Sequence, residues 1–306
     1  MSDIIDVIGF GALNLDKIIM VDKIPKSDEE GFIKSIDMFS GGSAANTIVG
    51  LARLGLNTGY IGKVGDDGEG STLIESMLYQ GVDIAGIKVS NGRSGLCLAF
   101  VDTNGDRALL IDPGVNDNIT LDDINIDYVR KTKFLHLSGF ICKESKQSFE
   151  TQKVLMREIN KTKISFDPGQ IYAEMGLKKL RDIIKNTDII LSNKNEIKML
   201  TGLDYKDGAQ LLLNKGVEIV VVKLGVDGCY ATNSEREFKI PIYNVNVIDT
   251  TGAGDAFNAG FLYGLIKDKN IEECGKLGNK VASFCIQKIG CRDGLPTLKD
   301  LVNLKG

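Results

Sequence analysis

The sequence predicts an α/β protein with a central, mostly parallel sheet and a small accessory β-sheet. Short apolar segments of strand length alternate with stretches that place apolar residues at helical spacing, which is typical of βαβ units. Two stretches break this alternation and resemble β-hairpins. The chain has 306 residues, 5 prolines and no internal repeat, so we expect a single domain over residues 1–306.

The regular alternation assigns most elements in order. Strands are expected at short apolar segments, namely Asp3–Phe10, Thr58–Lys63, Lys133–Leu137, Lys163–Asp167, Thr187–Ser192 and Glu218–Leu224. Helices are expected where apolar residues recur every three or four positions, at Ser43–Leu54, Glu69–Tyr79, about 253–265 and 271–287. The two helices that close the chain are the longest of these patterns.

The two stretches that break the alternation are Lys17–Phe39 and Leu96–Ile111. The first contains two short strands around the charged turn Lys26–Gly31, and the second is a hairpin that turns at Thr103–Asp106. Neither is long enough to form a domain alone. We therefore expect both to form one small sheet over an edge of the main sheet, in segments of about 17–39 and 94–112.

Composition and charge argue against several classes of function. Lysine and arginine number 37 and aspartate and glutamate 41, giving a net charge of -4, and no basic run offers a site for nucleic acid. The longest apolar stretches, such as Val217–Val222, are far too short to span a membrane. Acidic residues near the N-terminus, where a signal peptide needs basic ones, predict a cytoplasmic location.

Six cysteines and one histidine limit the available chemistry. No two cysteines have CxxC spacing, so we expect buried free thiols rather than a zinc site. His136 lies in an apolar, strand-like segment, which favours a core histidine over a catalytic one. Catalytic triads built on histidine are therefore not expected.

The segment Asp249–Phe257 carries the strongest chemical signal. It reads Asp-Thr-Thr-Gly-Ala-Gly-Asp-Ala-Phe and opens a predicted helix. Two glycines in a first turn cost about 1 kcal/mol each relative to alanine, but they let a ligand approach the backbone, where free amides and the helix dipole attract phosphate. A bound phosphate would repel Asp255, so a carboxylate at this position needs a function. Accepting the proton of a hydroxyl that attacks the phosphate is such a function. An ordinary capped helix start is the alternative.

Two segments nearer the N-terminus offer groups for a polar ligand. Gly41 and Gly42 precede a helix of small residues and would let a ligand hydroxyl reach the backbone, while Asn46 faces the start of that helix. Asn14 and Asp16 lie two positions apart on a predicted strand, so they share a face and suit vicinal hydroxyls. The alternative is that Gly41, Gly42 and Asn46 only form a tight helix start. Asn14 and Asp16 would then be ordinary polar residues of a turn.

Two further segments follow predicted strands, where α/β sheets hold ligands. In Asn193-Lys-Asn-Glu196 a carboxylate could orient Mg²⁺ that keeps its waters. In Lys223-Leu-Gly-Val-Asp-Gly228 a turn could wrap nucleotide phosphates, with Lys223 adding positive charge. A helix cap and a hairpin turn are the respective alternatives. The chain contains no GxxxxGK[ST] motif, which excludes a Walker-type site.

Together these motifs resemble those of the ribokinase (PfkB) family of sugar and nucleoside kinases. Gly41–Asn46 matches the N-terminal signature and Asp249–Asp255 the C-terminal one, while Asn193–Glu196 and Lys223–Gly228 match the two motifs between them. The resemblance implies a three-layer α/β/α ribokinase-like sandwich, with the accessory sheet as a lid. It also implies an ATP-dependent kinase that transfers the γ-phosphate to a hydroxymethyl group of a pentose-like sugar.

The resemblance further implies a role for each matching residue. Asp255 would be the catalytic base, and the amides of Gly252, Ala253 and Gly254 the anion hole. The acceptor would be held by Asn14, Asp16, Gly41, Gly42 and Asn46, and the nucleotide by Asn193, Lys223, Gly225, Gly228, Gly254 and Asn279. Glu196 would hold Mg²⁺ through water, and a K⁺ site would include Asp249, Thr251, Cys285 and Gly290. A homodimer through the lid is also expected.

The acceptor remains open at this point. Ser43 stands where ribokinases often carry lysine, and Lys223 where threonine or serine is common, so a nucleoside or a sugar phosphate is an alternative acceptor. Sequence does not decide between ATP and ADP as donor. Gly9-Phe-Gly11 suggests a nicotinamide-dependent dehydrogenase, but Asn14 replaces the third glycine of that fingerprint. A non-catalytic sugar sensor on the same fold is a further class.

Overall fold

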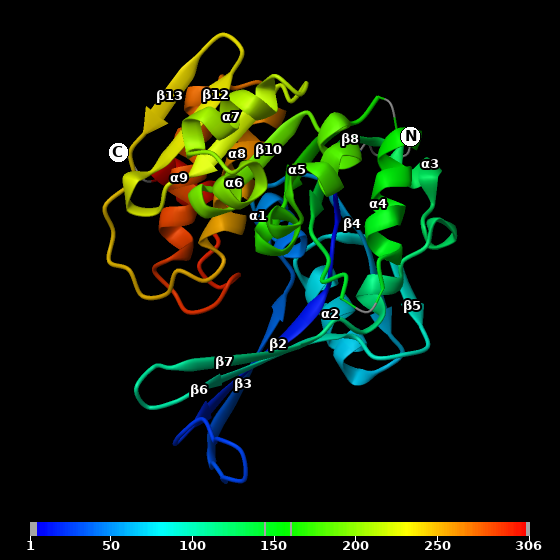
Figure 1. Cartoon of the computed structure of the whole chain (residues 1–306), viewed down its shortest axis with the longest axis vertical. Helices are drawn as coiled ribbons and strands as arrows, with labels where there is room; N and C mark the ends of the chain where they lie inside the picture. The colour runs from blue at the N-terminus through cyan, green and yellow to red at the C-terminus, as the bar shows by residue number, and fades with distance from the viewer. Residues whose placement is uncertain (1–4, 144, 160, 304–306) are drawn as a thin grey trace.

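A nine-stranded sheet forms the centre of the computed structural model, which describes residues 5–143, 145–159 and 161–303 (Figure 1). Its strand order is β13-β12-β11-β10-β9-β8-β1-β4-β5. Pairing is parallel from β5 to β11, and β12 and then the edge strand β13 are added antiparallel. The strands are β1 Ile5–Phe10, β4 Thr58–Gly65, β5 Asp83–Ser90, β8 Thr132–Ser138, β9 Lys163–Asp167, β10 Ile189–Asn193, β11 Ile219–Lys223, β12 Cys229–Asn233 and β13 Glu237–Ile240.

Helices cover both faces of this sheet, so the predicted three-layer α/β/α arrangement is confirmed. Strand side chains pack alternately into two separate apolar cores, such as Ile8 into one and Val7 into the other. The first core is covered by α3 Ile126–Val129, α4 Gln147–Glu158, α5 Gly169–Lys185, α6 Lys194–Thr201 and α7 Tyr205–Leu213. The second is covered by α1 Ser43–Arg53, α2 Gly68–Tyr79, α8 Ala253–Ile266, α9 Ile271–Cys285 and α10 Leu298–Asn303.

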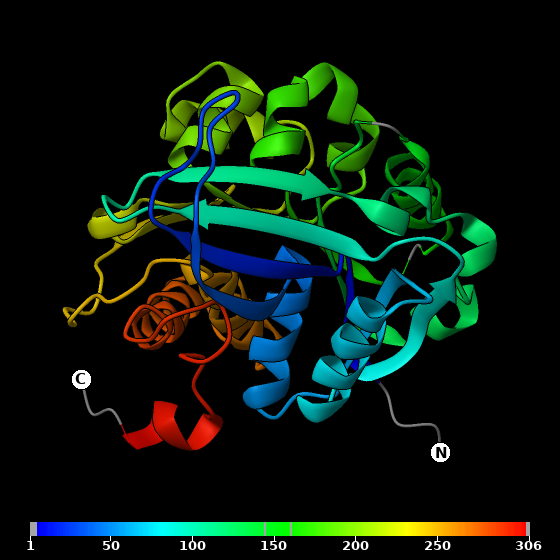
Figure 2. The same cartoon turned by 90° about the horizontal axis from the view of Figure 1, so that it is seen from below.

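The two stretches that break the alternation form the predicted second sheet. It has the order β3-β2-β6-β7 and projects from the body of the molecule (Figures 1 and 2). Its strands are β2 Asn14–Val21, β3 Ile33–Gly41, β6 Gly95–Val101 and β7 Arg107–Asp112. Strands β6 and β7 form the predicted hairpin, in which the Asp102 amide donates to the Asp106 carbonyl oxygen. This four-stranded sheet is called the lid below.

Most predicted elements lie within two residues of their observed bounds. Strand β9 begins and ends as predicted, and the first two residues of the predicted strand Asp3–Phe10 lie outside the described residues. The strands of the main sheet that the sequence did not predict are the two edge strands β5 and β13 and the antiparallel strand β12 beside β13. The edge strands are partly exposed and lack the continuous apolar run that identifies a buried parallel strand, and β12 is a short strand that ends in the polar residues Thr232 and Asn233.

Two general expectations can be compared with the described residues. All six cysteines are free thiols, as predicted, and four of them are buried, whereas Cys97 and Cys291 are only partly buried and so differ from the expectation. Within the described part of the chain, no helix has the length and apolar character needed to cross a membrane.

Candidate active site

Asp255 lies in the first turn of α8, where it faces the start of α1. Its Oδ1 accepts a hydrogen bond from Ser43 Oγ (2.7 Å), and its Oδ2 accepts one from Asn46 Nδ2 (2.9 Å). Desolvation raises the pKa of Asp255 to about 6, although these two hydrogen bonds oppose the shift. The side chain is therefore ionised at neutral pH and has the proton affinity of a general base.

The first turn of α8 also presents free backbone amides beside this carboxylate. The helix is entered through Gly252, whose φ of 76° is left-handed and whose position allows no β-carbon because Cys291 lies against it. The amides of Gly252, Gly254 and Asp255 find no acceptor among the residues that the structure describes. The predicted anion hole differs at Ala253, because its amide already donates to the Thr250 carbonyl oxygen (3.2 Å) in the turn that starts the helix.

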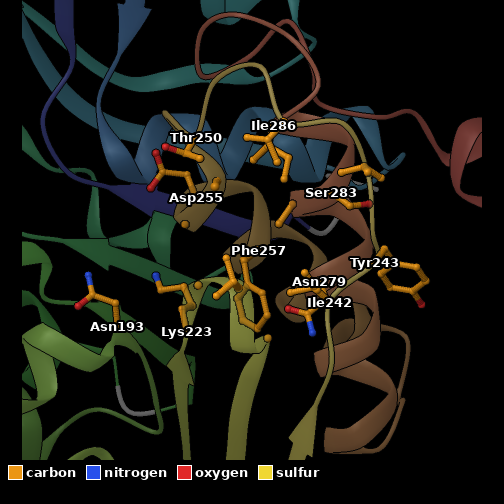
Figure 3. Close-up of a pocket in the computed structure, with 18 of the residues that line it drawn as sticks. Asn193, Lys223, Ile242, Tyr243, Thr250, Asp255, Phe257, Asn279, Ser283 and Ile286 are labelled. Carbon is orange, nitrogen blue, oxygen red and sulfur yellow. The ribbon is translucent and has the colours of Figure 1, made fainter. Parts of the chain in front are cut away.

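A cavity of about 530 Å³ reaches the first turn of α8 at Gly254 and Asp255, and Figure 3 shows Asp255 in its wall. Asp255, Lys223 and Asn193 lie at one end, and Asn279 and Tyr243 lie toward the other. Apolar side chains from the segment after β13 and from the C-terminal part of α9 and its cap also line the cavity, namely Ile242, Val245, Val247, Ala282 and Ile286. A flat aromatic base fits such an apolar slot, and its phosphates would then reach the amides of α8.

Three residues that were predicted to bind the nucleotide have structural roles in the fold. Asn279 donates from Nδ2 to the carbonyl oxygens of Ile240 (3.1 Å) and Pro241 (2.9 Å), so it fixes the segment that walls the slot. Gly225 and Gly228 form the turn after β11 with positive φ angles of 62° and 84°. A β-carbon at Gly228 would collide with the Ile240 carbonyl, so this glycine is required for packing.

Asn193 and Glu196 form a reciprocal capping box at the start of α6. Asn193 Oδ1 accepts from the Glu196 amide (2.9 Å), and Glu196 Oε2 accepts from the Asn193 amide (2.8 Å). Burial raises the pKa of Glu196 to about 7, and the negative charge of Asp167 adds to the shift. One Glu196 oxygen stays outside the capping box, and a cation near it would relieve the repulsion between the carboxylates.

A divalent cation at this edge of the cavity would have few protein ligands. Among the described residues, no group of three or more histidine, cysteine, aspartate or glutamate side chains converges on one point. Mg²⁺ accepts such a site, because it is commonly bound through one or two carboxylates, its own waters and substrate phosphates. The residues present therefore fit a magnesium ion that arrives with substrate phosphates, and Glu196 is the residue that would hold it through water.

The predicted acceptor residues lie on the lid side of Asp255. Asn14 begins β2, and its Oδ1 accepts from Asn116 Nδ2 (2.9 Å). A β-carbon at Gly41 would collide with the Asp16 carboxylate, so this glycine makes room for it. Burial raises the pKa of Asp16 to about 6. The positive charge of Arg292 opposes this shift and the negative charge of Asp255 adds to it.

Gly42 has a different reason to be glycine. Its φ is 103°, a backbone conformation that other residues rarely adopt, and a β-carbon there would strike the Ala12 carbonyl oxygen. The backbone amide of Asn46 donates to the Gly42 carbonyl oxygen (2.8 Å), which closes the first turn of α1. This tight start brings Ser43 and Asn46 to Asp255.

The sequence prediction missed Arg292, which comes from the segment after α9. Its side chain is buried, and its Nε donates to Asn46 Oδ1 (2.8 Å). The guanidinium also reaches Ser76 Oγ (3.1 Å) and the Gly41 carbonyl oxygen (3.2 Å). Because Arg292 occupies the oxygen of the Asn46 amide, the amide nitrogen must face Asp255.

Three of the four residues predicted for a potassium site meet in one pair of loops. Asp249 Oδ1 accepts from the amide (2.9 Å) and hydroxyl (2.6 Å) of Thr251, and Asp249 Oδ2 accepts from the Gly290 amide (2.9 Å). Cys285 Sγ approaches the carbonyl oxygens of Thr251 (3.8 Å) and Cys291 (3.7 Å). Asp249 therefore joins the loop before α8 to the loop after α9.

His136 is a core residue, as the sequence indicated. It is fully buried in β8, and its Nδ1 lies 3.0 Å from Ser165 Oγ. Burial lowers the pKa of His136 to about 4, so the ring is neutral. His136 is therefore not one of the predicted active-site residues.

Sequence comparisons identify the relatives of this chain. A family model described as pfkB family carbohydrate kinase matches residues 5–298. A protein of Archaeoglobus fulgidus described as an uncharacterised sugar kinase is 50% identical over 82% of this chain and 100% of its own length. An ATP-dependent ribose-1-phosphate kinase of Halopiger xanaduensis is 30% identical over 94% of this chain and 93% of its own.

Structural comparisons agree with the sequence relatives. The chain is similar to the crystal structure of ribokinase from Thermotoga maritima, with a TM-score of 0.86 and 26% identity over 97% of this chain and 98% of the other. It is also similar to an Escherichia coli protein assigned as a ribokinase II in complex with ATP and Mg²⁺ (TM-score 0.83, 25% identity, 97% and 98% covered).

Proposed function

This chain belongs to the PfkB family of carbohydrate kinases, and from that premise we propose that it transfers the γ-phosphoryl group of ATP to a hydroxymethyl group of a pentose-like sugar. The observation that carries this proposal is the position of Asp255. Its carboxylate is held by Ser43 and Asn46 and lies beside the unpaired amides of Gly252 and Gly254. A base and an anion site in contact are what phosphoryl transfer to a hydroxyl requires.

Each part of the site has a role in the proposed reaction. The apolar slot binds the adenine, the amides of α8 bind the phosphoryl group, and Asn14, Asp16 and Asn46 orient the hydroxyls of the acceptor. Asp255 takes the proton of the attacking hydroxyl at its carboxylate. The lid excludes water, which would otherwise compete with the sugar as acceptor.

Two ions belong to the proposal. Mg²⁺ would be held by Glu196 through water and would neutralise charge on the nucleotide phosphates. K⁺ would lie between the loops that Asp249 joins, with Thr251, Cys285 and Gly290 around it. The Asp249 carboxylate and the carbonyl oxygens of Thr251 and Cys291, which both lie near Cys285 Sγ, would supply the oxygen ligands of K⁺. Both requirements are tested by activity in Mg²⁺-free buffer and by replacing K⁺ with Na⁺.

A sugar phosphate is the second candidate acceptor. It is favoured by the ribose-1-phosphate kinase that is 30% identical to this chain. It is also favoured by the buried Arg292 guanidinium, which has no carboxylate within salt-bridge distance among the described residues. A cation in this position adds positive potential to the acceptor side of the site.

The test is an acceptor panel with purified protein. Pentoses, their 1-phosphates, fructose-type sugars, sugar acids and nucleosides are each incubated with Mg²⁺ and either ATP or ADP. Formation of the new phosphate ester is followed by ³¹P NMR. We expect one class to be phosphorylated with ATP, with Asp255→Asn as the inactive control. Tight binding of a sugar without phosphorylation by any member of the panel would instead support a non-catalytic sensor.

We also propose a homodimer through the lid. The strand register places Met38, Leu98 and Leu110 on one face with Lys17, which pairs with Glu69, and Met38 and Leu110 are 64% and 60% exposed. An exposed apolar sheet face of this kind is typical of an interface. Sedimentation should therefore give a dimer mass, and Met38→Glu should give a monomer that still melts cooperatively. A wild-type monomer at micromolar concentration would contradict this assembly.

A further inference from the structure

A lysine, an aspartate and an asparagine form a closed cluster beside the free amides of α8. Lys223 and Asp167 end the strands β11 and β9, and Asn258 lies in the second turn of α8. Lys223 Nζ donates to Asp167 Oδ2 (2.8 Å) and to Asn258 Oδ1 (3.1 Å). Asn258 Nδ2 donates to the same Asp167 oxygen (2.7 Å), and the Gly169 amide donates to the other (2.9 Å). The ammonium is therefore held from two sides.

This arrangement leaves one N–H of the ammonium for the cavity. A lysine ammonium has three N–H groups, and no described residue accepts the third from Lys223. A β-carbon placed on Gly254 would lie 3.4 Å from Nζ, so the ammonium is directly beside the first turn of α8. Lys223 and Asp255 lie at the same end of the cavity (Figure 3), and Gly254, next to Asp255 in the chain, also lines it.

The cluster keeps Lys223 charged in a place where a cation is costly. Burial would lower the pKa of Lys223, but the charges of Asp167 and Glu196 raise it above its ordinary value. Burial would raise the pKa of Asp167, and the Lys223 ammonium holds it low. A buried ion pair generally adds little stability compared with an apolar pair. Its location beside an anion site therefore calls for a functional explanation.

We propose that Lys223 is a catalytic residue that donates its third N–H to the phosphoryl group during transfer, and that Asp167 and Asn258 are positioning residues for its ammonium. This inference rests on the proposed function. The acceptor oxygen forms a bond to the γ-phosphorus while the bond from that phosphorus to the β–γ bridging oxygen breaks, and ADP leaves with the electron pair. Asp255 receives the hydroxyl proton. Charge on the transferring group is met by the amides of α8 and by Lys223.

This role differs measurably from simple nucleotide binding. A group that binds ATP and the transition state equally changes KM, whereas a group that acts in the transition state changes kcat. For Lys223→Met we expect kcat to fall by about 10²–10³-fold, the usual loss for one anion-hole donor, with the Kd for ADP within about threefold of wild type. Lys276→Met, which removes an exposed lysine paired with Glu272 on α9, is the matched control and should leave both unchanged.

A double variant separates catalysis from stability. Lys223→Met alone leaves the buried Asp167 carboxylate without its cation, which destabilises the fold. In Asp167→Asn/Lys223→Met the charge balance is restored, so the melting temperature should return toward wild type while kcat stays low. Recovery of kcat together with stability would overturn the catalytic role. Asp167→Asn alone keeps the lysine without its anchor, and we expect it to lower kcat about tenfold, a typical effect of losing a supporting residue.

A binding experiment distinguishes failure of this inference from failure of the proposed function. ADP, Mg²⁺ and aluminium fluoride, a mimic of the transferring phosphoryl group, are titrated into wild type and into Lys223→Met. We expect aluminium fluoride to tighten ADP binding to wild type and to do so at least tenfold less in the variant. Equal tightening in both overturns the assignment of Lys223. No tightening in wild type refutes the proposed kinase function, and the role of Lys223 with it.

Discussion

Replacing the Asp255 carboxylate with an amide should inactivate the protein and also stabilise it. The pKa of Asp255 is raised from 3.8 to about 6, mainly by desolvation. This shift of roughly two units corresponds to about 3 kcal/mol at about 1.4 kcal/mol per unit. Because the folded pKa is the higher one, the native state gains stability from the proton below pH 4 and loses that gain as the pH rises through 6. Above pH 6 the ionised side chain is therefore a cost.

The variant Asp255→Asn removes this cost without removing the contacts. The new amide oxygen can accept from Asn46 Nδ2, and the new amide nitrogen can donate to the Ser43 hydroxyl oxygen. We expect a gain of up to about 3 kcal/mol in the free energy of unfolding at pH 8, decreasing by about 1.4 kcal/mol at pH 5. Phosphoryl transfer should fall by about 10²–10⁴-fold, the usual contribution of a general base.

The assay is urea unfolding of wild type and variant at both pH values, beside kinase activity. Glu235→Gln, which neutralises an exposed carboxylate in the β12–β13 turn, is the control and should show no such pH-dependent gain. Two results would refute the reasoning: a variant no more stable than wild type at pH 8, or a gain that does not change between pH 8 and pH 5. Either would mean that Asp255 is not a desolvated carboxylate.

Three further predictions follow from the same site. Arg292→Lys keeps a positive charge but cannot hold the Asn46 oxygen in the same geometry, so kcat should fall about tenfold while ADP affinity, measured by calorimetry, stays at the wild-type value. Gly41→Ala places a methyl group against the Asp16 carboxylate, so the KM for the acceptor should rise while the KM for ATP does not, as steady-state kinetics will report. Finally, kcat/KM should decline on the acid side near pH 6 as Asp255 and Asp16 take up protons; a flat profile between pH 5 and 8 would contradict both assignments.

Local chemistry makes the centre of the site predictable. Glycine at a helix start costs stability, so Gly252 and Gly254 favour a ligand at this turn, and the structure adds a backbone reason for Gly252, its left-handed φ against Cys291. The same reasoning places Gly41 and Gly42 at a tight helix start, which the structure contains. The lid is predictable because its two hairpin-like segments interrupt an otherwise regular alternation of strands and helices.

The remaining parts depend on contacts that local patterns do not encode. Arg292 lies in a segment without helical or strand periodicity, and its partner Asn46 is 246 residues away. Asn116 lies in a short turn of 3-10 helix, and its task of holding Asn14 requires β2 to be in place. The sequence places Lys223 in a phosphate-binding turn, but its partners Asp167 and Asn258 reach it only because the fold sets the strand ends and α8 side by side.

The position of Arg292 has a consequence for how the enzyme is made. The ribosome synthesises the chain from the N-terminus, so the strands of the main sheet can pair before the segment after α9 has been made. Yet the residue that orients Asn46 lies 246 positions further along the chain. A nascent polypeptide that does not yet include Arg292 would therefore have α1 and α8 without the side chain that fixes the orientation of the Asn46 amide beside Asp255.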